Sequence, residues 1–169
     1  MRSPPHRLPL VNVALLKSTR VPPGAYTRQD MERLTAYVLA AQKVRGPVEL
    51  AVDITGHKRI QALNRRYRGV DRTTDVISFR DDLMPHLNPL PKGEGGAARV
   101  RLHGDIAINV HQAALQAKKM RHSLKREMRL LLIHGILHLL GFTDYEPAPR
   151  RRMFKRQNAI LRNWEAKNR

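Results

Sequence analysis

The chain has 169 residues, of which 41% are hydrophobic, so it is long and apolar enough to fold as one domain with its own core. No cysteine is present, which excludes disulfides and cysteine-based zinc sites, and no apolar run reaches the roughly 18–20 residues that a membrane span requires. Lys and Arg number 32 against 14 Asp and Glu. This formal net charge of +18 predicts a polyanionic partner, nucleic acid or the ribosome, with a solvated basic surface as the alternative.

Residues 1–9 carry three prolines and two arginines and predict a flexible basic arm. The apolar segment behind this arm is short, contains Asn12 and lacks a small-x-small cleavage site, so we expect no signal peptide and a cytoplasmic protein. Residues 10–169 are expected to form a single domain. The residues discussed below indicate that this domain is catalytic.

Hydrophobic periodicity and turn residues divide this domain into strands and helices. Strands are expected at residues 10–17, 48–55, 74–79 and 101–110, and helices at residues 28–44, 57–67, 111–120, 124–140 and 147–166. Thr27 and Ser123 are the expected N-caps of two helices, and Gly141 is the expected stop of the fourth. The segment 80–99 holds several Pro and Gly residues and predicts a long surface loop. The fold class is therefore α+β (mixed α/β), with a mostly parallel or mixed sheet of about four strands and helices packed on it.

The stretch HGILHLLGFTD, residues 134–144, places two histidines four residues apart in an otherwise apolar helix. Positions at that spacing share one helix face, and two imidazoles on a central buried helix need polar partners. One metal ion would satisfy His134 and His138 together, and Gly141 would turn the chain so that Asp144 supplies a third ligand. Three protein ligands leave a fourth position open for water, as in catalytic zinc sites.

An alternative without metal is open for the same residues. The two histidines would then bond to buried carbonyl groups, and Asp144 would cap the final helix, which begins near Pro147. Gly135 stands where the HExxH zinc peptidases carry their catalytic glutamate, which argues against a peptidase. Its missing side chain would let a substrate approach the metal closely.

Several blocks of the sequence resemble the YbeY family, metal-dependent endoribonucleases of rRNA maturation and ribosome quality control. HGILHLLGFTD is similar to the family signature H-G-x-L-H-L-x-G-[YF]-x-H, and NRRYRGVDRTTDVISF, residues 64–79, to N-x-x-Y-R-x(5)-T-D-V-L-S-F. HGDIAINV, residues 103–110, resembles the family's G-D-I strand, and RRMFKRQNAIL its final helix. These blocks span about residues 50–161, and together they are far more specific than the histidine pair alone.

The resemblance implies hydrolysis of single-stranded RNA at one divalent metal ion, with zinc as the first expectation. His134 and His138 would be catalytic metal ligands, and Arg68, at the family's Y-R arginine, would stabilise the negative transition state. A surface salt bridge is the alternative for Arg68. The family's third ligand is histidine, where this sequence has Asp144. A carboxylate shifts preference towards Mn or Fe(II), and we expect it to retain the metal less tightly.

Two acidic residues are candidates for orienting the histidines. Asp105 would do so from a strand, or would instead be a turn residue at the strand end. Glu127 would do so from the histidine helix, or would simply favour the helix dipole. Aromatic residues make up 5% of the chain, so no base-stacking platform is expected and RNA recognition should rest on backbone contacts.

The expected partners are rRNA and the ribosome or its small subunit, in 16S rRNA maturation, with no DNA and no membrane. Two alternatives remain open at this point. One is a non-catalytic, basic ribosome- or RNA-binding protein with a degenerate metal site. The other is a metal-dependent hydrolase of another substrate. The sequence predicts no oligomeric state.

Overall fold

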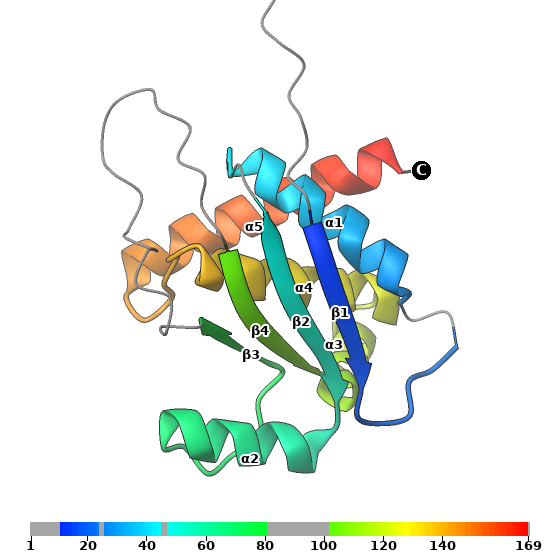
Figure 1. Cartoon of the computed structure of the whole chain (residues 1–169), viewed down its shortest axis with the longest axis vertical. Helices are drawn as coiled ribbons and strands as arrows, with labels where there is room; N and C mark the ends of the chain where they lie inside the picture. Colours follow the sequence, from blue (N-terminus) through cyan, green and yellow to red (C-terminus); the bar gives the residue numbers. More distant parts are fainter. Residues whose placement is uncertain (1–10, 24–25, 45–46, 81–101, 169) are drawn as a thin grey trace, which may run out of the picture.

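The computed structural model describes residues 11–23, 26–44, 47–80 and 102–168. Along these residues the elements follow in the order β1 (Val11–Lys17), α1 (Arg28–Ala41), β2 (Val48–Thr55), α2 (His57–Arg68), β3 (Val76–Arg80), β4 (Leu102–Asn109), α3 (Val110–Lys119), α4 (Leu124–Leu139) and α5 (Pro147–Lys167) (Figure 1). The predicted arm over residues 1–9 lies outside the described residues, and so does the predicted loop over 80–99 beyond Arg80, which ends β3.

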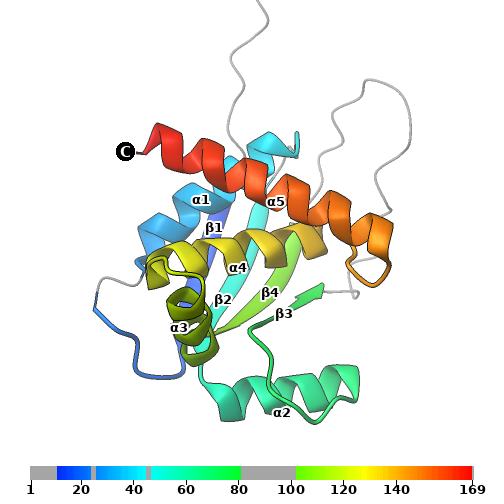
Figure 2. The same ribbon diagram turned by 180° about the vertical axis from the view of Figure 1, so that it is seen from behind.

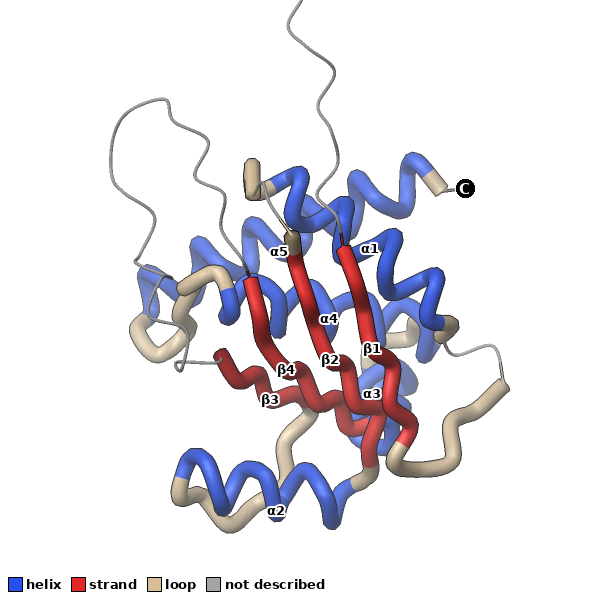
Figure 3. The backbone as a smooth tube through the Cα atoms, viewed as in Figure 1, coloured by secondary structure: helices blue, strands red, loops and turns tan. Residues whose placement is uncertain are grey.

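The strands form one mixed sheet in the order β1-β2-β4-β3 (Figure 3). β1, β2 and β4 run parallel, and β3 pairs antiparallel with β4 at the edge of the sheet. The register places Ser78 of β3 opposite Ile106 of β4. The predicted α+β class, with a mixed sheet of four strands, is confirmed.

Helices cover the sheet unequally. Seen from behind, α4 crosses the sheet and α5 lies across α4, and these two helices with α1 cover one face (Figure 2). The main core lies there, with Val52, Ile106 and Leu132 fully or almost fully buried. On the other face α2 builds a smaller core, in which its Ile60 packs with Ile77. The two cores place α4 and the end of α2 on opposite sides of β3 and β4.

Two glycines bring α4 close to β4. A Cβ atom at Gly135 would lie 2.9 Å from Cγ2 of Ile106, and one at Gly104 would lie 3.0 Å from the side chain of Leu139. Both distances are shorter than ordinary packing allows, so larger side chains would push the helix off the sheet. Close packing on Ile106 therefore requires a glycine at position 135, and the same glycine borders the space beside His134 and His138.

The two expected N-caps are confirmed. The Thr27 hydroxyl accepts a hydrogen bond from the Asp30 amide at 3.0 Å and forms a capping box at the start of α1. The Ser123 hydroxyl accepts from the Arg126 amide at 3.2 Å before α4. No helix in the described ranges is both long and apolar enough to cross a bilayer.

Candidate metal centre

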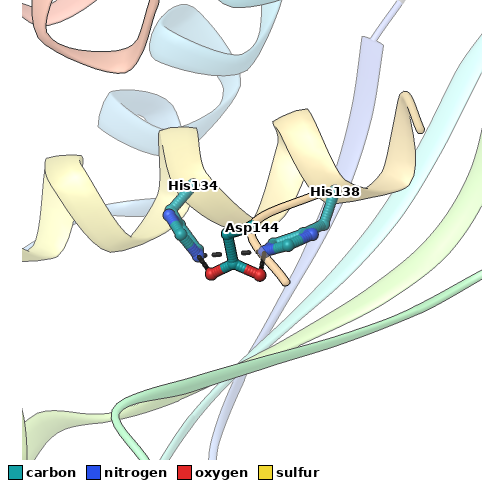
Figure 4. A group of neighbouring side chains, drawn as sticks. All are labelled: His134, His138 and Asp144. Carbon is teal, nitrogen blue, oxygen red and sulfur yellow. Dashed lines mark hydrogen bonds and ion pairs between the residues drawn. The ribbon is translucent and has the colours of Figure 1, made fainter. Parts of the chain in front are cut away.

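The turn after α4 brings Asp144 back to the two histidines. Gly141 has φ +88°, which a glycine adopts without strain, and the Phe142 amide donates to the Leu137 carbonyl at 3.0 Å. The chain reverses there, and the Asp144 carboxylate points at the imidazoles of His134 and His138 (Figure 4).

The three side chains converge on a small space. The Nε2 atoms of His134 and His138 lie 3.0 Å apart. The Asp144 carboxylate places Oδ2 at 3.8 Å from Nε2 of His134 and Oδ1 at 3.7 Å from Nε2 of His138 (Figure 4). The histidine side chains are 15% and 18% exposed and the aspartate side chain 30%, so the space is partly open to solvent.

Outer partners aim both imidazoles at this space. The Phe142 carbonyl oxygen lies 2.9 Å from Nδ1 of His138, and the Gln157 amide oxygen lies 2.9 Å from Nδ1 of His134. Because a carbonyl oxygen only accepts, each Nδ1 carries the proton and donates it. The lone pair of each Nε2 therefore faces the common space, which is the tautomer that a metal requires.

The protonation state of His138 agrees with this role. Burial lowers the pKa of His138 below its ordinary value near 6.5, and the neighbouring His134 lowers it further. The Asp144 carboxylate opposes both effects by raising this pKa. Because burial is the largest effect, the imidazole tends to the neutral form, in which it can donate a lone pair.

These residues fit a divalent cation. Two nitrogen lone pairs and a carboxylate oxygen lie within 4.8 Å of one another, so these electron-rich atoms repel each other. A cation between them would balance this repulsion. Two ligands of tetrahedral zinc, each roughly 2.1 Å from the ion, lie about 3.4 Å apart, close to the distances observed here. Within the described ranges, no other group of three or more His, Cys, Asp and Glu residues meets the same geometric criterion.

The structure brings Arg68 to the same site. It is the last residue of α2, it is exposed, and it lines a pocket of about 120 Å³ together with His134, His138 and Asp144. Its positive charge is close enough to lower the pKa of His138 slightly. In the described part of the chain no hydrogen bond or ion pair engages its guanidinium, so the salt bridge considered as an alternative is not found there.

Neither acidic candidate orients the histidines. Asp105 lies within β4, beside Ile106, which packs on α4, so the alternation of a strand turns Asp105 to the opposite face. Glu127 lies about two turns, or roughly 10 Å, before His134 along α4. There its carboxylate contacts Nε2 of His122 at 3.1 Å. Glu127 lies in the first turn of α4, which agrees with the alternative that it favours the helix dipole. Gln157 and the Phe142 carbonyl take the orienting role for which the two acidic residues were candidates.

Comparison with known proteins agrees with this geometry. The family model described as Endoribonuclease YbeY matches residues 17–165. The chain belongs to the YbeY family. Endoribonuclease YbeY of Roseiflexus castenholzii is 40% identical over 133 residues, covering 78% of this chain and 79% of the relative. The Lysinibacillus sphaericus protein of the same name is 36% identical over 137 residues, covering 79% and 83%.

A solved structure supports the fold of this family member. The solution structure of TM1509 from Thermotoga maritima matches with a TM-score of 0.55 and 20% identity, covering 92% of this chain and 93% of that one. At this identity the likeness supports the arrangement of helices and strands, and the site depends on the side chains described above.

Proposed function

We propose that this chain is a metal-dependent endoribonuclease that hydrolyses phosphodiester bonds of single-stranded rRNA. The convergence of His134, His138 and Asp144 in a pocket that the Arg68 side chain also lines carries the proposal. Membership of the YbeY family and the net charge of +18 support RNA as the substrate.

Each residue has a separate task in this proposal. Nε2 of His134, Nε2 of His138 and a carboxylate oxygen of Asp144 would hold the cation. When bound, a divalent cation supplies a Lewis acid that polarises a phosphoryl oxygen and lowers the pKa of water. The Arg68 guanidinium would bind the non-bridging phosphate oxygens and stabilise the negative charge that they gain during attack.

The outer partners serve the same reaction. Gln157 and the Phe142 carbonyl would keep each Nδ1 protonated, so that each Nε2 lone pair would be available to hold the cation. Zinc fits two histidines and one carboxylate, and the carboxylate also suits Mn or Fe(II). We further propose a cytoplasmic protein that acts on the ribosome or its small subunit in 16S rRNA maturation.

A cleavage assay tests this function. A single-stranded rRNA fragment is incubated with the purified protein, with and without a chelator, and with His134→Ala beside the exposed control His111→Ala. We expect the wild type and His111→Ala to cleave the RNA. Cleavage should be lost when the chelator is added and in His134→Ala, and the chelated wild type should recover it when zinc or manganese is added. Cleavage that persists both with chelator and in His134→Ala would contradict the proposal.

The two alternatives predict other results in the same assay. A non-catalytic RNA-binding protein would retain the RNA without cutting it under any metal condition. A hydrolase of another substrate would bind the metal but would not bind RNA in a salt-dependent way, whereas binding to a phosphate backbone weakens steeply with added salt.

A further inference from the structure

A groove of about 890 Å³ extends from the metal centre along the face of the sheet that carries α2. It shares Arg68, Ser78 and Tyr145 with the small pocket around the metal ligands, so the two spaces are neighbours. Small-molecule sites measure roughly 300–1,000 Å³, so the groove has room for a nucleobase with its sugar. A chain whose phosphate lies at the metal centre would therefore place a neighbouring nucleotide here.

Aromatic rings gather in this groove despite their low number in the sequence. Tyr145 is 80% exposed and follows the metal-ligand candidate Asp144 directly. Tyr67 is 57% exposed and directly precedes Arg68, and its ring lies 4.6 Å from that of Phe79. The Arg66 guanidinium also lies over the Tyr67 ring, 5.4 Å from its centre, so the exposed ring of Tyr145 is the one best suited to stacking with another flat ring.

The groove carries charges of both signs, because Asp53 and Asp105 line it together with three arginines. Asp53 lies on its wall, where it accepts hydrogen bonds from the Ser18 hydroxyl at 2.6 Å and from Arg59 at 2.7 Å. The Asp105 carboxylate also lines the groove and is exposed. The two carboxylates can accept hydrogen bonds from the amino and imino groups of nucleobases, which a phosphate backbone does not offer.

We infer that this groove is a nucleobase-binding subsite, in which Tyr145 stacks on the base next to the scissile phosphate and Tyr67 extends the stacking surface. The inference rests on the proposed function and adds to it. A base reaches such a surface when it is unpaired and unstacked from its neighbours, so the subsite selects single strands. Recognition then combines base stacking with the backbone contacts that the sequence alone predicted.

The test compares two fluorescent oligonucleotides in the presence of chelator, a 12-nucleotide single-stranded RNA and an abasic chain with the same number of phosphates. For Tyr145→Ala we expect the affinity for RNA to fall roughly 5- to 150-fold, the range given by stacking on one base, and the affinity for the abasic chain to stay unchanged. Tyr145→Phe keeps the ring and should bind as the wild type does. Met120→Ala, which removes a side chain 65% exposed on the surface at the end of α3, serves as the control.

The outcomes separate this subsite from the proposed function. Equal losses of affinity for both oligonucleotides, no loss in Tyr145→Ala, or equal binding of the two oligonucleotides by the wild type would overturn the subsite. If the wild type prefers RNA through Tyr145 but does not cleave it with metal restored, the subsite stands and the proposed catalysis fails. Circular dichroism of each variant checks that its fold is unchanged.

Discussion

Gln157 of α5 holds its amide oxygen 2.9 Å from Nδ1 of His134 on α4. This contact joins two helices and fixes the tautomer of a metal-ligand candidate, and Gln157 itself is 6% exposed. Partners of this kind typically raise metal affinity by roughly 10- to 100-fold. For Gln157→Leu we therefore expect weaker metal binding by about that factor, measured by competition with a chelating dye.

The neighbouring residue provides the control for this prediction. Asn158 is exposed on the same helix, so Asn158→Leu adds a similar side chain without touching the site. Equal metal affinities of the Gln157 and Asn158 variants would show that the Gln157 contact does not support the ligand.

Asp144 replaces the histidine that the family signature has at this position. The Asp144 carboxylate, 30% exposed, offers a harder and less tightly held ligand than an imidazole. We expect Asp144→His to retain more zinc after purification than the wild type, and Asp144→Ala to retain less than either. Metal analysis of the three purified proteins measures this order, and equal retention would contradict it.

Arg68 should affect cleavage and leave metal binding alone. Its guanidinium lines the pocket but is no ligand, so Arg68→Ala should lower the rate of RNA cleavage by roughly 10²-fold at unchanged metal content. Arg68→Lys should recover part of the rate, because it restores the charge without the bidentate fork.

Arg65, one turn earlier on α2, is the matched control for Arg68. It is exposed and pairs loosely with Asp71 at 3.9 Å, away from the pocket. Arg65→Ala should leave the rate near that of the wild type. A comparable drop in both variants would indicate a general charge effect instead of transition-state stabilisation.

Gly135 should be required for packing. In Gly135→Ala the new methyl group would lie 2.9 Å from Cγ2 of Ile106. Such overpacking costs about 1–3 kcal/mol, partly offset by up to ~1 kcal/mol of helix propensity. We expect a lower free energy of unfolding in urea. In an Ile106→Ala background the same change should be neutral or stabilising, and a loss of equal size in both backgrounds would exclude this contact as the cause.

Tyr26 should make the fold sensitive to alkali. Burial raises the pKa of the Tyr26 phenol well above its ordinary value of 10.0, with the nearby Arg129 opposing this effect. The folded state then holds the phenolic proton more tightly than the unfolded state, so this stabilisation is complete below about pH 10 and is lost as the pH rises further. Urea unfolding between pH 8 and 11 should show a shallower loss of stability in Tyr26→Phe, and parallel curves would contradict the prediction.

Local sequence signals predicted most of the fold. β2 runs over residues 48–55, as its alternating pattern predicts, and side-chain caps marked the starts of α1 and α4. α1 nevertheless ends at Ala41, short of the predicted Val44, because Lys43 takes up a left-handed conformation with φ +58°. β3 begins two residues late at Val76, because the Asp75 carboxylate accepts from the Val76 amide and holds a turn there.

The site was predictable where its residues are close in sequence. His134, His138 and Asp144 lie on one helix and the turn behind it, so their spacing alone suggested a common site. Gln157 joins them through the packing of α5 on α4, which no local pattern encodes. The sequence contained one indication of this role, because Gln157 is a polar residue on the face of α5 that also carries the buried Met153 and Ile160.

The aromatic groove was hidden for the same reason. Tyr67, Phe79 and Tyr145 come from α2, β3 and the turn after α4, and the sheet brings them together. A count of aromatic residues therefore underestimated what the surface offers to a base.

A crystal structure of the protein grown with zinc, with anomalous diffraction recorded at the zinc edge, tests whether His134, His138 and Asp144 hold a metal ion. We expect one anomalous peak roughly 2.0–2.2 Å from Nε2 of His134, Nε2 of His138 and a carboxylate oxygen of Asp144. A peak elsewhere, or an Asp144 carboxylate turned away from the two histidines with no peak between them, would contradict it.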